Sequence, residues 1–193
     1  MTTDIQGEIV LQHIEATLGQ PDEVWRRERD GSLLQFQVLL FRNKPEDGSF
    51  CLVTFGLSAH HFEGPKGGIL RFELLLCGRS HFDSKALSAL LIAVGRYCLG
   101  KHSAPGLHGI LPGDGAVLDN PKFEHIYWSF PGLLPEEFEL CRNVSPPVHF
   151  FQLLPISSAE RDLIQSLGWR EFEDRLCRSR VDVLEFDRRE EVS

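Results

Sequence analysis

The stretch "ILRFELLLC", residues 69–77, decides the fold. Successive side chains of a β-strand point to opposite faces, and this stretch offers one face that is wholly apolar. That face carries Leu70, Phe72, Leu74 and Leu76. On the other face Arg71 and Glu73 are expected side by side, within reach of a common polar partner. The stretch therefore predicts a strand in a sheet with one face packed against the core.

Other extended runs precede this strand. "SLLQFQVLLF" (32–41) and "SFCLVTF" (49–55) have strand-like patterns, and the shorter "EVWRRE" (23–28) comes before them. Turn-forming residues separate them, in "RNKPEDG" (42–48) and "HHFEGPKGG" (60–68). Short connections between neighbouring runs favour antiparallel pairing, so we expect a meander of about four strands.

Two helices are predicted before and after this meander. An N-terminal helix over 4–19 places Ile5, Ile9, Ile14 and Leu18 on one face, and "GQPD" ends it. The segment "SKALSALLIAVGRYCLG" (84–100) has the apolar stripe of a helix packed on a sheet, and Gly100 is its expected end. The stripe consists of Leu87, Leu90, Leu91, Val94 and Cys98.

The C-terminal third predicts a further strand and two helices. "VHFFQLLP" (148–155) reads as the strand, and Ser157 with Glu160 has the spacing of a capping box at the start of a helix. A second helix follows, with Trp169, Phe172 and Leu176 as its apolar positions. The Pro- and Gly-rich residues 103–138 predict short strands joined by turns.

The expected fold is a single α+β domain over 1–193, with a mixed, largely antiparallel sheet flanked by helices. Its core is expected over 23–180, followed by a charged and frayed tail over 185–193. A length of 193 residues is within the usual range for one domain.

The charge composition indicates which classes of partner are expected. Lys and Arg number 20 and Asp and Glu 28, for a formal charge of −8, without a clustered basic patch. Nucleic acid and anionic membranes are therefore not expected as partners, whereas a basic or neutral protein is. The N-terminus "MTTDIQGE" lacks a secretory signal pattern, and "LSALLIAVG" is too short for a membrane span, so the cytoplasm is the expected location. The five scattered cysteines are expected to be reduced.

Two catalytic alternatives concern the polar segment "TFGLSAHH" (54–61). Ser58 lies two residues from His60, but G-L-S-A-H does not match the nucleophile elbow G-x-S-x-G of many hydrolases. A zinc site would draw on His60, His61, Cys77 and His81. Their spacing is irregular, and we expect no metal, no cofactor and no catalytic residue. A small hydrolase or a metal-dependent enzyme that uses His60, His61 and Cys77 stays open as an alternative, as does a self-associating scaffold.

A family resemblance is carried by three motifs in order. "LVTFGLSAHHF" contains T-x-G-x-S-x-H, "RFELLLC" contains R-x-E-L-x-x-C, and "PISSAE" contains P-I-x-x-x-E. Together, from about residue 25 to 180, they resemble the Suppressor of fused domain, in its bacterial single-domain type. The resemblance selects Thr54, Gly56, Ser58, His60, Arg71, Glu73 and Cys77, and in the third motif Pro155, Ile156 and Glu160.

The resemblance implies a non-enzymatic domain that binds a protein partner. The animal member clasps a short segment of a transcription factor as an added strand, and small bacterial members are implicated as immunity proteins that neutralise toxins. The expected function is thus protein binding, with a toxin domain as the candidate partner. Arg71 and Glu73 either face that partner, pair with each other, or brace the loop of Ser58 and His60 from inside.

Overall fold

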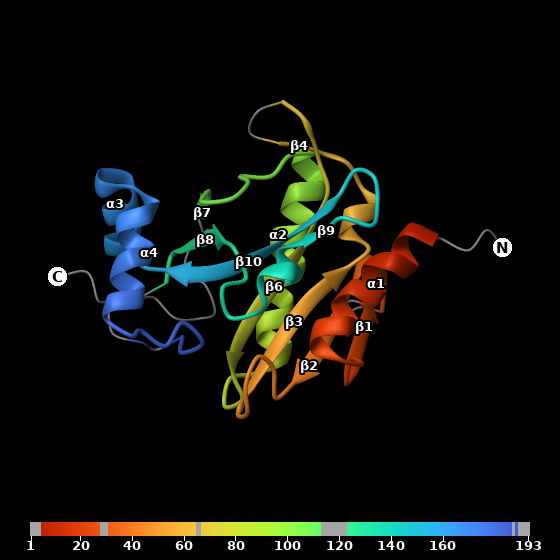
Figure 1. The fold of residues 1–193 in the computed structure, drawn as a ribbon, viewed down its shortest axis with the longest axis horizontal. Helices are drawn as coiled ribbons and strands as arrows, with labels where there is room; N and C mark the ends of the chain where they lie inside the picture. Colours follow the sequence, from red (N-terminus) through yellow and green to blue (C-terminus); the bar gives the residue numbers. More distant parts are fainter. Residues whose placement is uncertain (1–4, 28–30, 65–66, 113–122, 187, 189–193) are drawn as a thin grey trace.

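The computed structural model describes residues 5–27, 31–64, 67–112, 123–186 and 188. Within these ranges the chain forms one α+β domain, a mixed and mostly antiparallel sheet with helices on both faces (Figure 1). The predicted fold class is confirmed. Residues 113–122, part of the segment expected to form short strands and turns, lie outside the described residues.

Eight strands make up the main sheet of the described chain. They are β1 (Glu23–Arg27), β2 (Leu33–Arg42), β3 (Ser49–Phe55), β6 (Phe72–Arg79), β7 (Ile110–Pro112), β8 (His125–Ser129), β9 (Leu140–Cys141) and β10 (Val148–Ile156). The order across the sheet is β1-β2-β3-β6-β10-β8-β7, and β9 pairs with β10 beside this path. β10 runs parallel to β6, and the other pairs are antiparallel.

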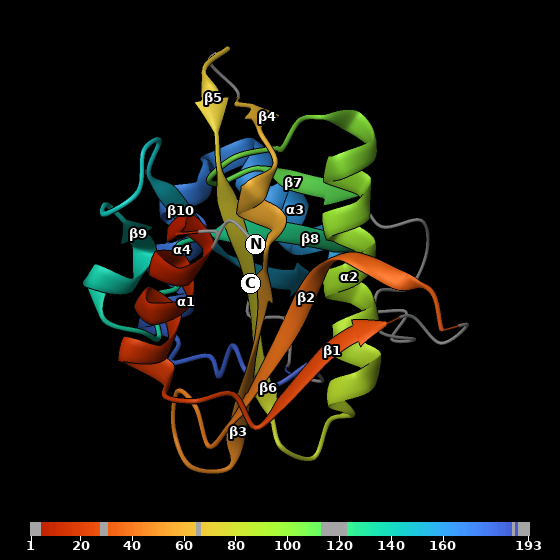
Figure 2. The ribbon, with the colours of Figure 1, turned by 90° about the vertical axis from the view of Figure 1, so that its right-hand side faces the viewer.

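The expected meander is confirmed as β1, β2, β3 and β6. The stretch 69–77 does not form one continuous strand, however. Its first residues are β5 (Ile69–Leu70), which pairs with β4 (Phe62–Glu63) in a separate two-stranded sheet that extends beyond the main one (Figure 2). Arg71 lies at the break between β5 and β6. The break divides one apolar run between two sheets.

Four α-helices flank the sheet in the described chain: α1 (Ile5–Leu18), α2 (Ser84–Lys101), α3 (Ser158–Leu167) and α4 (Trp169–Arg178). Figure 2 shows α1 and α2 on opposite faces of the sheet. The pair α3 and α4 packs at the end formed by β8 and β10 (Figure 1). In the described ranges, no helix has both the length and the apolar character that crossing a membrane requires.

The core between α2 and the sheet follows the predicted stripe. Leu87, Leu91, Val94 and Cys98 are buried, and Leu90 is partly buried. The helix lies so close to β2 that a Cβ at Gly95 would come within 2.5 Å of the Phe36 ring. The helix continues one residue beyond Gly100 and ends where His102 adopts a left-handed conformation (φ 51°).

The opposite face packs against α1 and the short 3₁₀ helix η3 (Glu136–Glu139). The buried residues of α1 are Val10, Ile14 and Leu18, whereas Ile5 is 67% exposed. The apolar face is therefore rotated from the predicted one. The spacing i, i+4, i+8 of the buried set is that of a helix side that meets a sheet.

The C-terminal helices begin as predicted and hold part of the expected tail. Ser157 and Glu160 form the complete capping box of α3. Glu160 also meets Arg188 in an ion pair with both side chains buried, 3.3 Å between Nη2 and Oε2. Phe186 is buried as well, so the expectation of a frayed tail is wrong at these two positions. Residues 187 and 189–193 lie outside the described part of the chain.

One expectation about the cysteines is corrected. Cys51 and Cys77 are joined as a disulfide between β3 and β6, while Cys98, Cys141 and Cys177 are free. The two residues are direct cross-strand partners, and their Cα atoms lie 4.2 Å apart. Such closeness depends on strand register, which the spacing of cysteines in the sequence does not show.

Candidate functional site

The first polar motif forms a tight turn at the end of β3. Gly56 has φ of 101°, in the left-handed region that favours glycine, and the 3₁₀ helix η1 (Leu57–Ala59) follows it. The N–H of His60 donates to the carbonyl of Leu57 at 3.0 Å and closes the turn. Residues 56–60, G-L-S-A-H, therefore form a corner that redirects the chain from the main sheet toward β4.

Glu73 holds this corner from inside the protein. Its side chain is fully buried and its carboxylate accepts four hydrogen bonds. The hydroxyls of Thr54 and Ser58 each donate at 2.6 Å, and the backbone N–H groups of Gly56 and Ser58 donate at 2.9 and 3.0 Å. The Thr54 hydroxyl in turn accepts from the N–H of Leu74 at 2.8 Å. Thr54, Gly56 and Ser58 are thereby tied to β6.

Burial governs the protonation of this carboxyl. Desolvation raises the pKa of Glu73 above its ordinary value, against the hydrogen bonds from Ser58, Thr54 and Gly56, which lower it. A carboxyl in an apolar core that retains four donors is a structural anchor rather than an exposed proton donor. Its neighbours depend on it, because buried N–H and O–H groups without an acceptor are costly.

Arg71 joins three further segments at the same corner. Its Nε donates to the carbonyl of Ser58 at 2.7 Å, and its Nη1 donates to the side chain of Gln6 at 2.8 Å and to the carbonyl of Pro146 at 3.0 Å. Arg71 is only 6% exposed. One side chain therefore fixes η1, α1 and the loop before β10 relative to one another.

A cavity of about 610 Å³ opens beside this corner. Gln6, Phe36, Phe55, Ala59, His61 and Pro146 are among the residues that line it. Ala59 and His61 are exposed, so the outer side of the turn is available to a partner while its inner side is tied to Glu73. Gly56, Ser58 and Arg71 of the motifs also line this cavity, although Ser58 and Arg71 are themselves buried.

Most of the polar motif residues predicted as the site meet directly. Thr54, Gly56, Ser58, Arg71 and Glu73 form one hydrogen-bonded cluster around η1. His60 ends the turn through its backbone and is half-buried. The third motif lies elsewhere, since Glu160 caps α3 and pairs with Arg188. Of the three open interpretations of Arg71 and Glu73, the geometry matches the bracing of the loop from inside.

The residues of the hydrolase and metal-site alternatives do not converge in the described structure. Ser58 is only 4% exposed, and its hydroxyl donates to the buried Glu73 and not to a histidine. Cys77 is bonded to Cys51, and His81 lies 3.0 Å from Glu185. Within the described residues, no group of three or more His, Cys, Asp or Glu side chains lies close enough to hold a metal ion.

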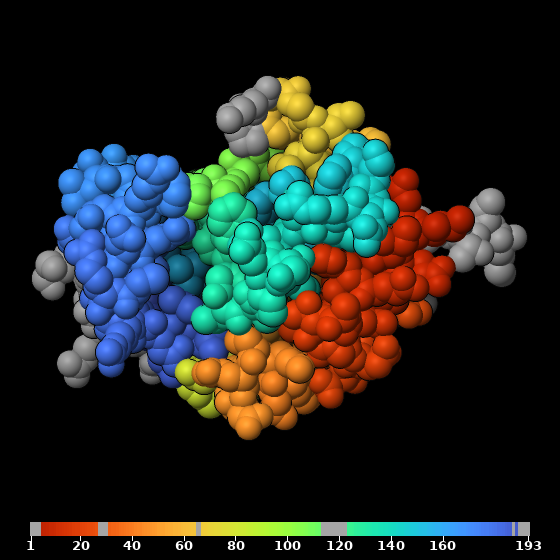
Figure 3. Space-filling model, in the orientation of Figure 1, coloured from red at the N-terminus to blue at the C-terminus, as the bar shows by residue number. Residues whose placement is uncertain are grey.

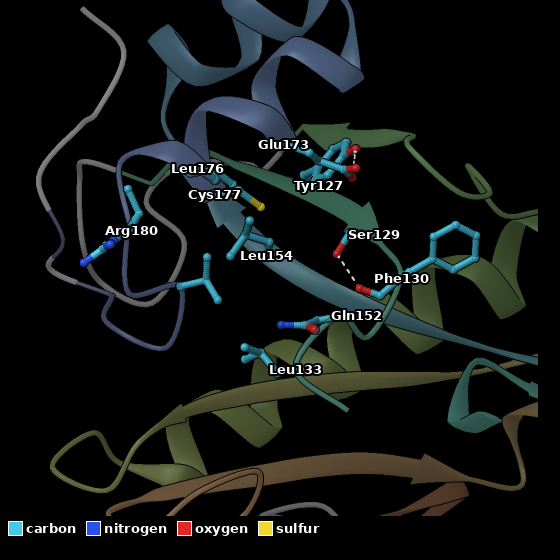
Figure 4. Close-up of a pocket in the computed structure, with 13 residues that line it drawn as sticks. Tyr127, Ser129, Phe130, Leu133, Gln152, Leu154, Glu173, Leu176, Cys177 and Arg180 are labelled. Atoms are coloured by element: carbon cyan, nitrogen blue, oxygen red, sulfur yellow. Dashed lines mark hydrogen bonds between the residues drawn. The ribbon is translucent and has the colours of Figure 1, made fainter. Parts of the chain in front are cut away.

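A second cavity, of about 470 Å³, lies between α4 and the strands β8 and β10 (Figure 4). At its edge the hydroxyl of Tyr127 donates to Glu173 at 2.8 Å, and Nδ1 of His108 lies 2.7 Å from the same hydroxyl. The His108 ring stacks on Trp169, with centroids 3.6 Å apart. Burial lowers the pKa of His108, which Glu173 opposes, and burial raises that of Tyr127.

Sequence reasoning missed this second cavity and the partners of Arg71. Gln6 and Pro146 lie 65 and 75 residues from Arg71, and no local pattern links them. The only sequence signal for the second cavity was the aromatic cluster "HIYWSFPG" (125–132), which reads equally as core. Packing between residues that are distant in the sequence determines both the second cavity and the partners of Arg71.

Comparison with known proteins agrees with this fold. The family model described as Suppressor of fused protein (SUFU) matches residues 33–189. A solved suppressor of fused homolog from Neisseria gonorrhoeae has a TM-score of 0.74 and 22% identity, over 97% of each chain. The Sufu–Fu complex gives 0.63 and 16%, over 92% of this chain and 84% of that one. No curated protein matches the chain.

A third structure, Drosophila Suppressor of Fused, gives a TM-score of 0.60 and 15% identity. The match covers 93% of this chain but 47% of that protein, so the similarity spans about half of it. At these identities the solved structures support the fold, whereas the match of the family model extends over most of the sequence, including the corner built by Ser58 and Glu73. The chain belongs to the Suppressor of fused family.

Proposed function

We propose that this chain is a non-catalytic protein-binding domain that acts in the cytoplasm as an immunity-type protein and neutralises a toxin partner. The observation that carries the proposal is the use of the Ser58 hydroxyl and two backbone N–H groups of the corner as donors to Glu73. Ser58 is also only 4% exposed, so the motif serves to hold the turn in place. Binding is the function that a fixed, shaped surface performs.

The proposed binding face is the outer side of the corner, where Ala59 and His61 border the cavity of about 610 Å³. Thr54, Gly56, Ser58, Arg71 and Glu73 act here by holding the turn, and His60 by ending it. Binding residues on a loop held by a rigid scaffold are common, because the scaffold fixes a shape that the loop alone cannot keep. Preorganisation lowers the entropy cost of association.

Two observations support a protein partner of this kind. A relative of similar fold was solved in the Sufu–Fu complex, and that likeness brings protein binding to this chain as part of the proposal. The formal charge of −8 suits a basic partner. Toxins that cleave nucleic acid present basic grooves, and an acidic surface associates with such grooves quickly.

The test is capture followed by neutralisation. The tagged chain is incubated with lysate of its source organism, and proteins enriched over an untagged control are identified by mass spectrometry and expressed alone. We expect one of them to arrest growth, and co-expression with this chain to restore it. Captured proteins that are all harmless when expressed alone would contradict the toxin partner, and a failure to capture any protein would contradict the binding function.

Surface variants locate the face. Ala59→Arg and His61→Glu alter the exposed side of the corner without removing a donor to Glu73, whereas Gln165→Glu alters an exposed position on α3. We expect the first two to weaken capture and rescue of growth and the third to leave both unchanged. Equal capture by all three, with unchanged melting temperatures, would place the interface away from the corner.

A further inference from the structure

The second cavity is an open groove between α4 and the turn that follows β8. Its floor is formed by β8 and β10, one wall by α4, and the other by the turn that follows β8 at 130–133. Figure 3 shows the hollow between the α3–α4 pair and this turn, and Figure 4 shows the side chains around it. Its volume of about 470 Å³ falls in the range of ligand sites.

Gln152 lies on the floor of this groove without a partner for its side chain. It is 5% exposed, and its amide makes no hydrogen bond with any residue that the structure describes. The backbone of Gln152 pairs with Leu75 of β6 and Ser129 of β8, so only its side chain is available to a ligand. Figure 4 shows the amide between Leu154 and Leu133. The amide lines the cavity and is free to pair with a ligand that offers a matching donor and acceptor.

The groove also has an apolar rim. Phe130 and Leu133 are each 41% exposed although both are large hydrophobic residues, and they lie on the same turn. Opposite them, α4 contributes Leu176 and Cys177. Adjacent exposed apolar side chains around a partly buried polar group are typical of surfaces that bind another molecule.

Among the described residues, two charged side chains line the groove, Glu173 and Arg180, and only that of Glu173 already has partners. The carboxylate of Glu173 accepts from Tyr127 at 2.8 Å and lies 3.4 Å from His108. Arg180 is exposed and forms no ion pair within the described ranges, and Figure 4 shows it beyond Cys177, at the end away from Phe130. The net charge available to a ligand is therefore positive, at one end of an apolar groove.

We propose that this groove binds an extended peptide segment of a partner protein, with an apolar side chain inserted between Leu133 and Leu176. A peptide group of the segment pairs with the Gln152 amide, which offers a donor and an acceptor as the peptide group does. A carboxylate of the segment, from an acidic side chain or a C-terminus, meets Arg180. The proposal rests on the proposed protein-binding function and names a second contact surface for it.

The test uses selected peptides of known sequence. The full chain is screened against a random linear peptide library, and enriched peptides are synthesised and measured by calorimetry. We expect an apolar residue close to a carboxylate in the enriched set, and affinity about tenfold weaker for Gln152→Leu and for Leu133→Glu. Leu167→Glu changes an exposed leucine on α3 and is the matched control, with unchanged affinity expected. Equal melting temperatures confirm that the variants fold.

The two sources of the carboxylate are separated by an amidated peptide. Loss of binding on C-terminal amidation assigns the contact to a chain end, and retention assigns it to an acidic side chain; Arg180→Glu weakens binding in both cases. The proposal is overturned if no peptide is enriched, or if Gln152→Leu and Leu133→Glu bind as the wild type does. It is also overturned if the wild type dimerises in solution and Leu133→Glu abolishes the dimer, because a second copy then occupies the groove.

Failure of this proposal is distinguishable from failure of the proposed function. If the partner is captured equally by the wild type, Gln152→Leu and Leu133→Glu, the groove is not used and the binding function stands. If selected peptides require Gln152 while no captured protein is toxic, the groove stands and the immunity role fails.

Discussion

The hydroxyl of Ser58, in η1, donates a 2.6 Å hydrogen bond to the carboxylate of Glu73, which lies fifteen positions later in the chain, on β6. The same carboxylate receives the N–H of Ser58 at 3.0 Å. One buried side chain thus satisfies two donors of one residue in a tight turn. The serine that a hydrolase would use as nucleophile here serves as part of the scaffold.

Replacement of Glu73 tests this role. Glu73→Ala leaves the N–H groups of Gly56 and Ser58 without their acceptor in a buried site, and we expect the free energy of unfolding to fall by about 3–5 kcal/mol. Because burial raises the pKa of Glu73, the neutral and isosteric Glu73→Gln is expected to cost less, about 1–2 kcal/mol. Urea denaturation measures both. Equal losses for the two variants would contradict the hydrogen-bonding role.

Gly56 supplies the backbone conformation of the corner. At φ of 101° an alanine is strained, although its Cβ would meet Phe36 at an ordinary 3.7 Å. Gly56→Ala is therefore expected to lower the free energy of unfolding by about 1–2 kcal/mol through the backbone alone. Gly100→Ala, in α2 with open space around it, is the control and is not expected to lower stability. Chemical denaturation of both variants decides; a wild-type midpoint for Gly56→Ala would show that the turn does not need glycine.

The sequence was sufficient to predict the meander and the central helix because their information is local. Strand alternation and the stripe from Leu87 to Cys98 depend only on neighbouring residues. It also placed Arg71 and Glu73 on one face, which both now reach Ser58. The break at Arg71, which divides one apolar run between two sheets, has no local signal.

Other features depended on distant packing and were missed. The Cys51–Cys77 bond follows from the register of β3 on β6, and the burial of Arg188 follows from its pairing with Glu160, 28 residues earlier. The rotation of the buried face of α1 toward Val10 reflects where the sheet lies. Each of these is decided by which surfaces meet, and single-sequence patterns do not carry that information.

The cysteines give a direct chemical test of the corrected pairing. Unfolding without a reductant is expected to allow three iodoacetamide labels, on the free Cys98, Cys141 and Cys177. In the native protein only the exposed Cys177 is expected to react quickly, because burial raises the pKa of Cys98 to about 12 and leaves little thiolate. Intact mass spectrometry counts the labels. All five cysteines labelled without a reductant would restore the original expectation of reduced thiols.

His108 predicts how stability depends on pH. Burial lowers its pKa below the ordinary 6.5, so the unfolded chain binds a proton there more readily than the folded protein does. The stabilisation is complete above pH 6.5 and is lost as the pH falls through the lower pKa of the folded state. For one proton the slope is at most about 1.4 kcal/mol per pH unit.

His108→Asn isolates this contribution. Asparagine tolerates the left-handed backbone found at His108 (φ 63°) and does not titrate. Urea midpoints above and below pH 6.5 are expected to show a flatter decline for the variant than for the wild type. The decline persists in part, since burial also lowers the pKa of His125 and of His149, and His108→Asn/His149→Asn should be flatter still. Parallel curves for the wild type and His108→Asn would mean that the stacked ring beside Trp169 charges as easily in the folded protein as in the unfolded chain.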